Sequence, residues 1–214
     1  MGRGHLIVFE GADGVGKSTQ VGLLAAWLAA AGRAAVVVRE PGGTPVGEAI
    51  RQLLLQPDHV MEPLTETLLF GAARHEVVER VIRPALAGGR VVLADRFTLS
   101  TVAYQHFGAG VPRAHVDTVN DWATGGLVPD LTLLLTAPVP RLTHRDRMEQ
   151  RDDGFHDRVR EGYRMLSREH EEDTSPSGWR RLVVLPQEGD TARVAAAVLD
   201  AVRPLLDGEE GRGA

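Results

Sequence analysis

The segment from Gly11 to Ser18 constrains the fold more than any other part of the sequence. It reads Gly-Ala-Asp-Gly-Val-Gly-Lys-Ser, which matches GxxxxGK[S/T], and it lies between an apolar run at 5–9 and a helical pattern at 17–31. Glycines there let successive backbone N–H groups face inward around phosphate oxygens, and the following helix adds the positive charge of its N-terminus. The pattern predicts a site for a nucleoside triphosphate with Mg²⁺, formed by Gly11, Asp13, Gly14, Val15, Gly16, Lys17, Ser18 and Thr19.

Lysine occurs once in the chain, and it occurs in this loop. Lys17 is the only lysine among the 24 basic residues. A site that needs a compact ammonium on a flexible stem, where a planar guanidinium would not fit, explains this usage. In such a loop the lysine reaches the β- and γ-phosphates and the hydroxyl of Ser18 coordinates the metal ion. The loop does not identify the acceptor, because GTPases, ATPases and small-molecule kinases all share it.

Short apolar runs alternate with helical patterns along the rest of the chain. The runs do not alternate apolar with polar residues, as expected for strands buried on both faces of a parallel sheet. This organisation implies an α/β fold with a doubly wound, five-stranded parallel sheet flanked by helices. We expect one P-loop domain over 1–206 and a disordered tail at 207–214. The predicted strands are 5–9, 34–38, 91–94, 131–135 and 182–185, and the predicted helices lie near 17–31, 47–55, 64–87, 97–106, 113–125, 155–173 and 191–206.

The composition argues against several other classes of protein. The formal net charge of −5 gives no global positive field for nucleic acid or a membrane, so a local basic cluster must hold any anionic substrate. Cysteine is absent, which excludes disulfides and thiolate metal sites and fits a reducing compartment. The histidines show no metal-ligand spacing, and the early apolar run is too short for a signal or membrane segment. We therefore expect a soluble, cytoplasmic protein without nucleic-acid or membrane partners.

Further segments resemble the thymidylate kinase family of P-loop nucleoside monophosphate kinases, in the family's order and spacing. Residues 39–44 read Arg-Glu-Pro-Gly-Gly-Thr and are similar to the family's REPGGT turn. Asp95-Arg96 followed by 100–105 is similar to DRYxxSxxAYQ, and 126–132 repeats GLxPDLT. Phe70 and Arg74, four residues apart, look like the family's base-binding helix. With the P-loop and residues 146–149, the resemblance covers nearly the whole chain.

The resemblance implies how the acceptor's base and sugar are held. The ring of Phe70 would stack on thymine, and Arg74 would donate to a base carbonyl. Thr101 and Gln105 would supply hydrogen bonds to the base edge. Tyr104 would lie under the sugar, where its bulk disfavours a ribose 2′-hydroxyl, and Asp13 would bind the acceptor's 3′-hydroxyl.

The acceptor phosphate and the metal ion have candidate residues of their own. Arg96 follows a predicted strand, at the edge where open α/β sheets bind ligands, and its guanidinium can take a phosphate bidentately. Arg51 is similar to a second family arginine on that phosphate. Asp95 and Glu40 are carboxylates near the expected metal, acting through its waters, so the predicted metal set is Ser18, Asp95 and Glu40. We expect the ATP- and Mg²⁺-dependent transfer of the γ-phosphoryl group to dTMP, with Lys17, Arg96 and Asp95 as catalytic residues.

The lid region departs from the family pattern. Gly14 stands where some members carry a P-loop arginine, so we expect arginines of a lid at about 141–154 to stabilise the transferred phosphoryl group, with Arg145 and Arg147 as the catalytic candidates and Arg151 beside them. The chain between Thr136 and Asp146 is several residues shorter than the family pattern implies. A shortened lid leaves open a kinase of a modified pyrimidine nucleotide or another small phosphate or phosphonate. It also leaves open a non-catalytic nucleotide-binding regulator. The resemblance further implies a homodimer.

Overall fold

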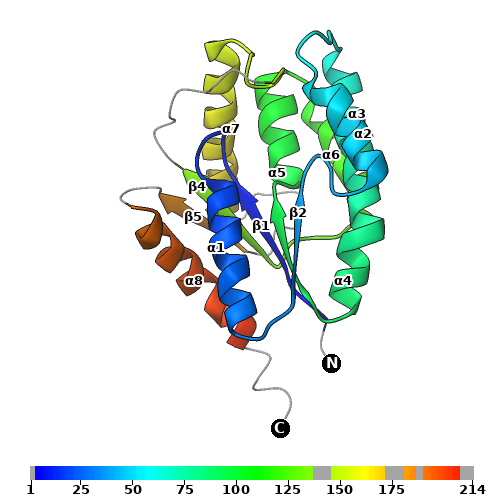
Figure 1. Cartoon of the computed structure of the whole chain (residues 1–214). Helices are drawn as coiled ribbons and strands as arrows, with labels where there is room; N and C mark the ends of the chain where they lie inside the picture. Colours follow the sequence, from blue (N-terminus) through cyan, green and yellow to red (C-terminus); the bar gives the residue numbers. More distant parts are fainter. Residues whose placement is uncertain (1–2, 137–145, 172–180, 187–189, 208–214) are drawn as a thin grey trace.

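Five short apolar segments form one parallel sheet in the computed structural model, which describes residues 3–136, 146–171, 181–186 and 190–207. Each neighbouring pair of strands is parallel, and the spatial order is β2-β3-β1-β4-β5 (Figure 1). The predicted five-stranded parallel sheet is confirmed. The strands are β1 (Leu6–Glu10), β2 (Ala35–Arg39), β3 (Val91–Asp95), β4 (Leu131–Thr136) and β5 (Leu182–Pro186).

Helices connect the strands and cover both faces of the sheet. Between β2 and β3, residues 63–87 form three consecutive helical segments without a break, where one helix at 64–87 was predicted. The helical segments are α1 (Lys17–Ala30), α2 (Pro45–Leu55), α3 (Pro63–Val77), η1 (Val78–Ile82), α4 (Arg83–Ala87), α5 (Thr98–Thr101), η2 (Val102–Gly108), α6 (Arg113–Thr124), α7 (Asp153–Glu171) and α8 (Thr191–Asp207).

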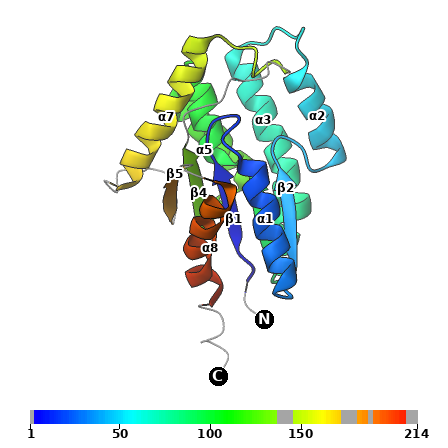
Figure 2. The ribbon, with the colours of Figure 1, turned by 60° about the vertical axis from the view of Figure 1, so that its left-hand side comes forward.

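The core divides along the two faces of the central strand. Ile7 and Phe9 of β1 point to the face covered by α1 and α8, which lie side by side in Figures 1 and 2. Leu6 and Val8 point to the opposite face and pack against η1 and α4. All five residues of β1 are buried, so this strand has no solvent-facing side and needs no polar alternation.

The strand order creates a crevice at the carboxyl end of β1. β3 pairs with β1 on one side and β4 pairs with it on the other. Connections that leave neighbouring parallel strands in opposite directions open a crevice beyond their carboxyl ends, which is where open α/β sheets bind ligands. The glycine-rich loop at 11–16 lies at this point, between β1 and α1.

Two π-helical segments were not predicted. η1 lies inside the predicted helix 64–87, and η2 extends the predicted helix 97–106 to Gly108. One extra residue per turn leaves the pattern of apolar residues nearly unchanged over one or two turns, so hydrophobic periodicity does not reveal it. Segments of this kind are frequent at functional sites, and η2 carries Tyr104 and Gln105.

The last helix, α8, extends into the predicted tail. Asp207, which we placed in the tail, is the last residue of α8, and the remainder of the predicted tail lies outside the described residues. No helix in the described ranges is long and apolar enough to span a membrane.

Candidate active site

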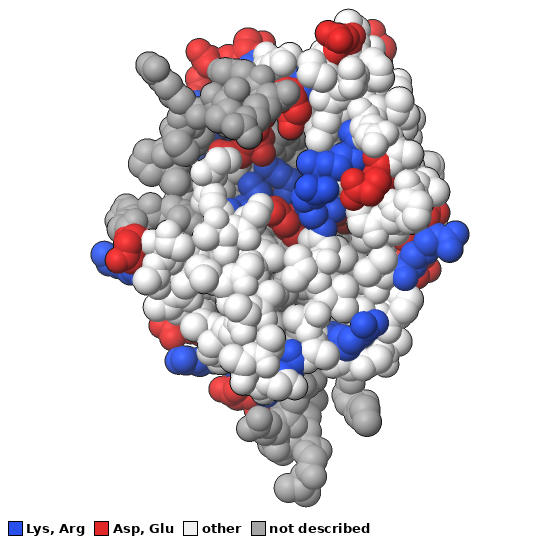
Figure 3. All heavy atoms as spheres, viewed as in Figure 1, with Lys and Arg blue, Asp and Glu red and all other residues white. Residues whose placement is uncertain are grey.

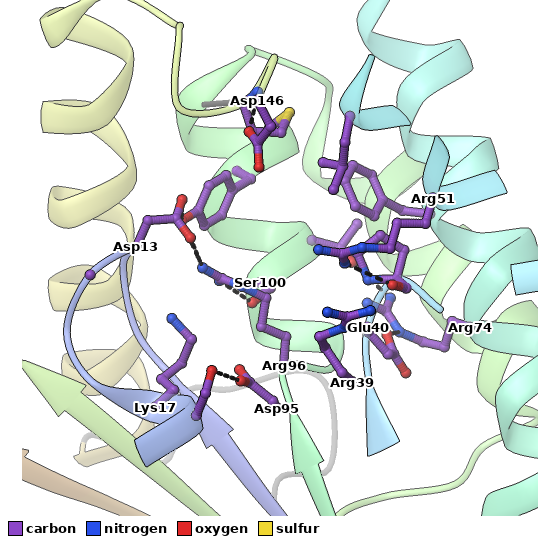
Figure 4. Close-up of a pocket in the computed structure, with 18 of the residues that line it drawn as sticks. Asp13, Lys17, Arg39, Glu40, Arg51, Arg74, Asp95, Arg96, Ser100 and Asp146 are labelled. Atoms are coloured by element: carbon purple, nitrogen blue, oxygen red, sulfur yellow. Dashed lines mark hydrogen bonds and ion pairs between the residues drawn. The ribbon is translucent and has the colours of Figure 1, made fainter. Parts of the chain in front are cut away.

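A cavity of about 410 Å³ lies at the carboxyl edge of the sheet. Basic side chains gather in this hollow on the face shown in Figure 3, and Figure 4 shows that they come from opposite walls. A local basic cluster on an acidic protein agrees with the requirement for an anionic substrate. The lining includes most of the predicted site: Asp13, Gly14, Gly16, Lys17, Ser18, Thr19, Glu40, Arg51, Phe70, Arg74, Asp95, Arg96, Thr101, Tyr104 and Gln105.

The loop before α1 has the backbone that a phosphate cradle needs. Gly11 has φ 135° and Gly16 has φ 85°, and a Cβ on Gly11 would lie 2.3 Å from the carbonyl oxygen of Leu135. The ammonium of Lys17 donates to the carbonyl oxygens of Gly11 at 2.9 Å and Ala12 at 2.8 Å. Lys17 is therefore held against the loop with its charge at the centre. Val15 is buried in the core, so only its backbone is available to a ligand.

Two oxygen groups of the predicted metal set meet directly. Ser18 Oγ donates a hydrogen bond of 2.6 Å to Asp95 Oδ2 (Figure 4). Glu40, the third member, is buried, and its Oε2 accepts from Arg74 at 2.7 Å. Its Oε1 is buried without a partner among the described residues. Burial raises the pKa of Glu40 to about 7 against the opposing effect of Arg74.

Arg96 is fixed at the centre of the cavity floor. It follows β3 with φ 77°, a left-handed conformation that is uncommon outside glycine and that is found at functional sites. One guanidinium nitrogen donates to the Ser100 hydroxyl at 2.9 Å, and the other donates to the Asp13 carboxylate and to the Tyr104 hydroxyl at 3.1 Å. The guanidinium also lies 4.9 Å from the centre of the Tyr104 ring. An incoming phosphate would therefore compete with Asp13 for Arg96.

The loop carboxylate and the loop lysine have shifted pKa values. Burial alone would raise the pKa of Asp13, but the charges of Arg96 and Lys17 outweigh it, and the hydrogen bond from Tyr104 helps to lower that pKa to about 2. Burial, reinforced by the positive charge of Arg96, lowers the pKa of Lys17 to about 8. Binding a phosphate beside Lys17 supplies the negative charge that favours its ammonium form.

Arg74 is buried at the opposite wall, with nearly all its donors in use. Its Nε donates to Glu40, its Nη1 donates to both Thr101 Oγ1 and Asn120 Oδ1 at 2.7 Å, and its Nη2 donates to the Phe97 carbonyl oxygen at 2.9 Å. A guanidinium has five N–H groups, so one N–H on Nη2 is left for a ligand. This wall is held rigidly by charge-assisted hydrogen bonds.

The remaining predicted acceptor residues line the same cavity as Arg74. Phe70 and Gln105 line the cavity from α3 and η2. Arg51 lines it from α2 and donates to the Pro41 carbonyl oxygen at 2.9 Å. The pKa of Arg51 is lowered by burial and then by the charge of Arg39. Cations that repel one another around an open cavity favour the binding of an anion between them.

Comparison with known proteins decides what kind of site this is. The family model for thymidylate kinase matches residues 9–175. Thymidylate kinases from Exiguobacterium sp. and Synechococcus sp. (strain JA-2-3B'a(2-13)) are 46% identical over 177 residues and 44% identical over 204 residues. These alignments cover 79% and 94% of this chain, and 84% and 95% of the relatives. A crystal structure of thymidylate kinase from Ehrlichia chaffeensis matches with a TM-score of 0.77 at 30% identity, covering 94% of this chain and 99% of that one. The chain belongs to the thymidylate kinase family.

Membership confirms the predicted family, its P-loop fold and the enzyme class. Thymidylate kinases transfer a phosphoryl group from ATP to dTMP, so the prediction of a phosphotransferase with this reaction is confirmed as well. The family does not assign a role to each side chain of this chain. The individual site residues stay predictions, supported by the geometry of the cavity.

The predicted lid arginines of this thymidylate kinase family member fall in two groups. Arg145 and the shortened stretch 137–145 lie outside the described residues. Arg147 is buried and donates to Glu66 Oε2 at 2.5 Å and to the Leu54 carbonyl oxygen at 2.7 Å, and it is not part of the cavity lining. Arg151 donates to the same Glu66 oxygen at 2.9 Å. A role for Arg147 at the transferred phosphoryl group would require it to leave Glu66, and this role stays a prediction.

Glu10 is a site residue that our reading of the sequence missed. It ends β1, is fully buried, and accepts from the backbone N–H groups of Phe97 at 2.8 Å and Ser100 at 3.1 Å. Its second oxygen accepts from the hydroxyls of Ser100 at 2.6 Å and Tyr163 at 3.0 Å. Both hydroxyls also accept from Arg96. A charged residue between an apolar strand and the glycine-rich loop was the available signal.

Arg39 is the second residue that was missed. It ends β2, lines the cavity beside Arg51, and its side chain is 55% exposed (Figure 4). Its guanidinium lies 3.7 Å from the carboxylate of Glu48, which is a loose contact for an ion pair. The available signal was its place directly before the turn that carries Glu40.

Proposed function

We propose that this chain transfers the γ-phosphoryl group of ATP to dTMP through the residues that line this one cavity. The observation that carries the proposal is the convergence of the two substrate sites. Lys17 and Ser18 approach from the glycine-rich loop, while Arg51, Phe70 and Arg74 approach from the opposite wall (Figure 4). Two anionic substrates bound to these walls would have their phosphates facing each other.

The donor would bind along the loop and the first turn of α1. Backbone N–H groups of residues 13–19 would surround the β-phosphate, and Lys17 would exchange its two carbonyl partners for phosphate oxygens. An acceptor phosphate oxygen forms the new bond to the γ-phosphorus, while the bond from that phosphorus to the β-bridging oxygen breaks and ADP leaves. The acceptor oxygen is already deprotonated, so no general base is needed.

The residues near Lys17 fit a bound Mg²⁺. This ion prefers oxygen ligands and is usually bound through one or two protein groups, with waters and substrate phosphates completing its shell. Ser18 and Asp95 supply a hydroxyl and a carboxylate in direct contact, with Glu40 in the same cavity. Among the described residues there is no cluster of three or more acidic or histidine side chains that would form an all-protein site. When bound, Mg²⁺ would neutralise phosphate charge beside Ser18.

Arginines would align the acceptor phosphate. Arg96 and Arg51 are the proposed ligands, and Arg39 is positioned to join them. Catalysis in this scheme consists of aligning two anions and neutralising the charge on the moving phosphoryl group. Fixing Arg96 through Asp13, Ser100 and Tyr104 limits the reorganisation that this alignment requires.

The acceptor's nucleoside would occupy the wall formed by α3 and η2. Phe70 would stack on the base, Arg74 would donate its remaining N–H to a base carbonyl, and Gln105 would meet the base edge. Thr101 would act mainly by holding Arg74, whose Nη1 it already accepts. Tyr104 would contact the sugar and Asp13 its 3′-hydroxyl.

The test is nucleotide turnover by the purified protein. ADP release with ATP and Mg²⁺ should be fast on dTMP and slower on dUMP, dCMP, UMP and dGMP, and Lys17→Ala should abolish it. Tight ATP binding with negligible turnover on dTMP would overturn the proposal. No feature of the described residues favours the modified-nucleotide or regulatory alternatives. Only a failure to phosphorylate dTMP would make them the next hypotheses to test.

We further propose a homodimer in the cytoplasm. Large apolar side chains are exposed on three neighbouring helices, with Val46 and Leu53 on α2, Leu64 and Leu68 on α3, and Trp122 on α6. A surface of this kind favours association with a second copy. The absence of cysteine fits a reducing compartment. Size-exclusion chromatography with light scattering should give twice the mass of the 214-residue chain. In Leu68→Glu, the measured mass should shift toward that of the monomer.

A further inference from the structure

Glu66 is a buried carboxylate just behind the cavity wall. It lies in the first turn of α3 and is fully buried, while the cavity lining includes its neighbour Gln105 but not Glu66 itself. One of its oxygens, Oε2, accepts from Arg147 at 2.5 Å and from Arg151 at 2.9 Å. The other, Oε1, accepts from Gln105 Nε2 at 3.0 Å. Every contact of this carboxylate is therefore made with a donor.

This arrangement fixes which end of the Gln105 amide faces the cavity. A carboxylate flanked by two guanidinium groups accepts hydrogen bonds on both oxygens. The reversed amide would place its carbonyl oxygen against Glu66 Oε1, where two acceptors would repel each other. The NH₂ end of Gln105 must therefore point to Glu66. Within the described part of the chain no donor reaches Gln105 Oε1, which leaves this oxygen as the acceptor on the cavity side.

We propose that Glu66 is a positioning residue that sets the base specificity of the reaction by orienting the Gln105 amide. The inference rests on the proposed function, because it takes the base to lie against Gln105. A fixed carbonyl oxygen accepts from the N3–H group of thymine or uracil. Cytosine carries an unprotonated N3 at that place, so its lone pair would face the Gln105 oxygen.

Arg74 reinforces the same choice. Its remaining N–H can donate to the O4 carbonyl of thymine, whereas cytosine carries an NH₂ donor at that position. A donor from Arg74 beside an acceptor from Gln105 matches the edge of thymine or uracil and opposes the edge of cytosine. A site that holds its polar groups in place rejects the wrong partner because those groups would stay unpaired.

The direct test replaces Glu66 with glutamine. Arg147 and Arg151 can only donate, so the introduced amide must keep its oxygen toward them and turn its NH₂ toward Gln105. The Gln105 amide then flips by about 180° and presents its NH₂ group to the cavity. In Glu66→Gln, kcat/KM for dTMP and dUMP should fall together by about 10- to 100-fold, the equivalent of one or two hydrogen bonds. The value for dCMP should stay level or rise.

Two controls separate this effect from a general one. Glu62→Gln makes the same change at the exposed residue directly before α3, whose side chain makes no capping hydrogen bond, and it should leave the dTMP-to-dCMP ratio unchanged. In a Gln105→Ala background, Glu66→Gln should no longer change that ratio, because the group through which it acts is gone. A persistent change in that background would overturn the proposal.

A measurement on the wild-type protein covers the case in which the variant does not fold. The Nε2 proton of Gln105 that is donated to Glu66, assigned in amide NMR spectra by comparison with Gln105→Ala, should exchange slowly with solvent in the unliganded protein. Fast exchange, or an equal loss for all nucleotides in a folded Glu66→Gln, would contradict the role of Glu66. Wild-type protein that fails to phosphorylate dTMP would instead contradict the proposed function.

Discussion

Ser18 Oγ donates a 2.6 Å hydrogen bond to Asp95 Oδ2, which joins the first turn of α1 to the end of β3. The two groups come from segments 77 residues apart, and the parallel pairing of β1 with β3 brings them together. A hydroxyl and a carboxylate already in contact need little reorganisation to share one cation. The pair therefore predicts where metal dependence originates.

Asp95→Asn should lower kcat by about 10²–10³-fold, as expected when one preorganised electrostatic group is lost. Removing Mg²⁺ with EDTA should abolish ADP release in the wild type, and Asp95→Asn should need more Mg²⁺ for half-maximal rate. A Mg²⁺ titration of ADP release measures both effects. Asp200→Asn, at an exposed residue of α8, is the matched control. An unchanged Mg²⁺ requirement in Asp95→Asn would remove Asp95 from the metal site.

Asp13→Asn should destabilise the protein at neutral pH but not in strong acid. The pKa of Asp13 is lowered from 3.8 to about 2, so its contribution is complete above pH 3.8 and disappears as the pH falls through 2. The cavity admits solvent to this side chain, so we expect about 1–2 kcal/mol. Urea unfolding at pH 7 and pH 3 measures it, with the exposed Asp157→Asn as control. A difference from wild type that does not shrink at pH 3 would contradict the assignment.

Glu10→Gln should lower both stability and turnover. The carboxylate accepts from four donors at the start of α5, and an amide can offer only its one oxygen as acceptor. We expect a loss of about 2–4 kcal/mol in unfolding free energy because buried donors are left without partners. Urea titration measures this loss. Ser167→Ala, which removes an exposed hydroxyl, should have little effect. A Glu10→Gln protein as stable as wild type would show that this network is not important for the fold.

Arg39→Ala and Arg51→Ala should each raise KM for dTMP by about 10- to 100-fold, the value of one charge-assisted hydrogen bond. ATP affinity should change little, because both arginines stand on the wall opposite Lys17 (Figure 4). Steady-state kinetics with dTMP and ATP varied in turn separates the two effects. Arg203→Ala, on the exposed side of α8, is the control. An effect of Arg39→Ala on ATP alone would place this arginine with the donor.

The strands could be predicted from sequence to within one residue at each end, and three of the differences share one cause. The predicted strands stop one residue short of Glu10, Arg39 and Asp95, because a charged side chain ends an apolar run. In the structure these residues still pair in the sheet, and all three face the carboxyl edge where the cavity lies. The charged side chain that ended each of these predicted strands is therefore also the signal that marks the site.

The partners of each side chain could not be predicted in the same way. Nothing in the spacing of Glu66, Gln105 and Arg147 shows that they meet, because they belong to three segments that only the tertiary fold brings together. The motif residues could be predicted because short-range geometry fixes them. Glu66 depends on long-range packing, and it became visible only through its contacts.

The single lysine has a practical consequence for chemical labelling. Apart from the amino group at Met1, Lys17 Nζ is the only primary amine in the chain. An acylating reagent can therefore modify one internal site, and the deprotonated form that it needs is accessible because the pKa of Lys17 is lowered to about 8. A nucleotide in the loop would both shield this amine and keep it protonated. The mass gained by an internal peptide would thus report the occupancy of the phosphate loop, without any label on the nucleotide.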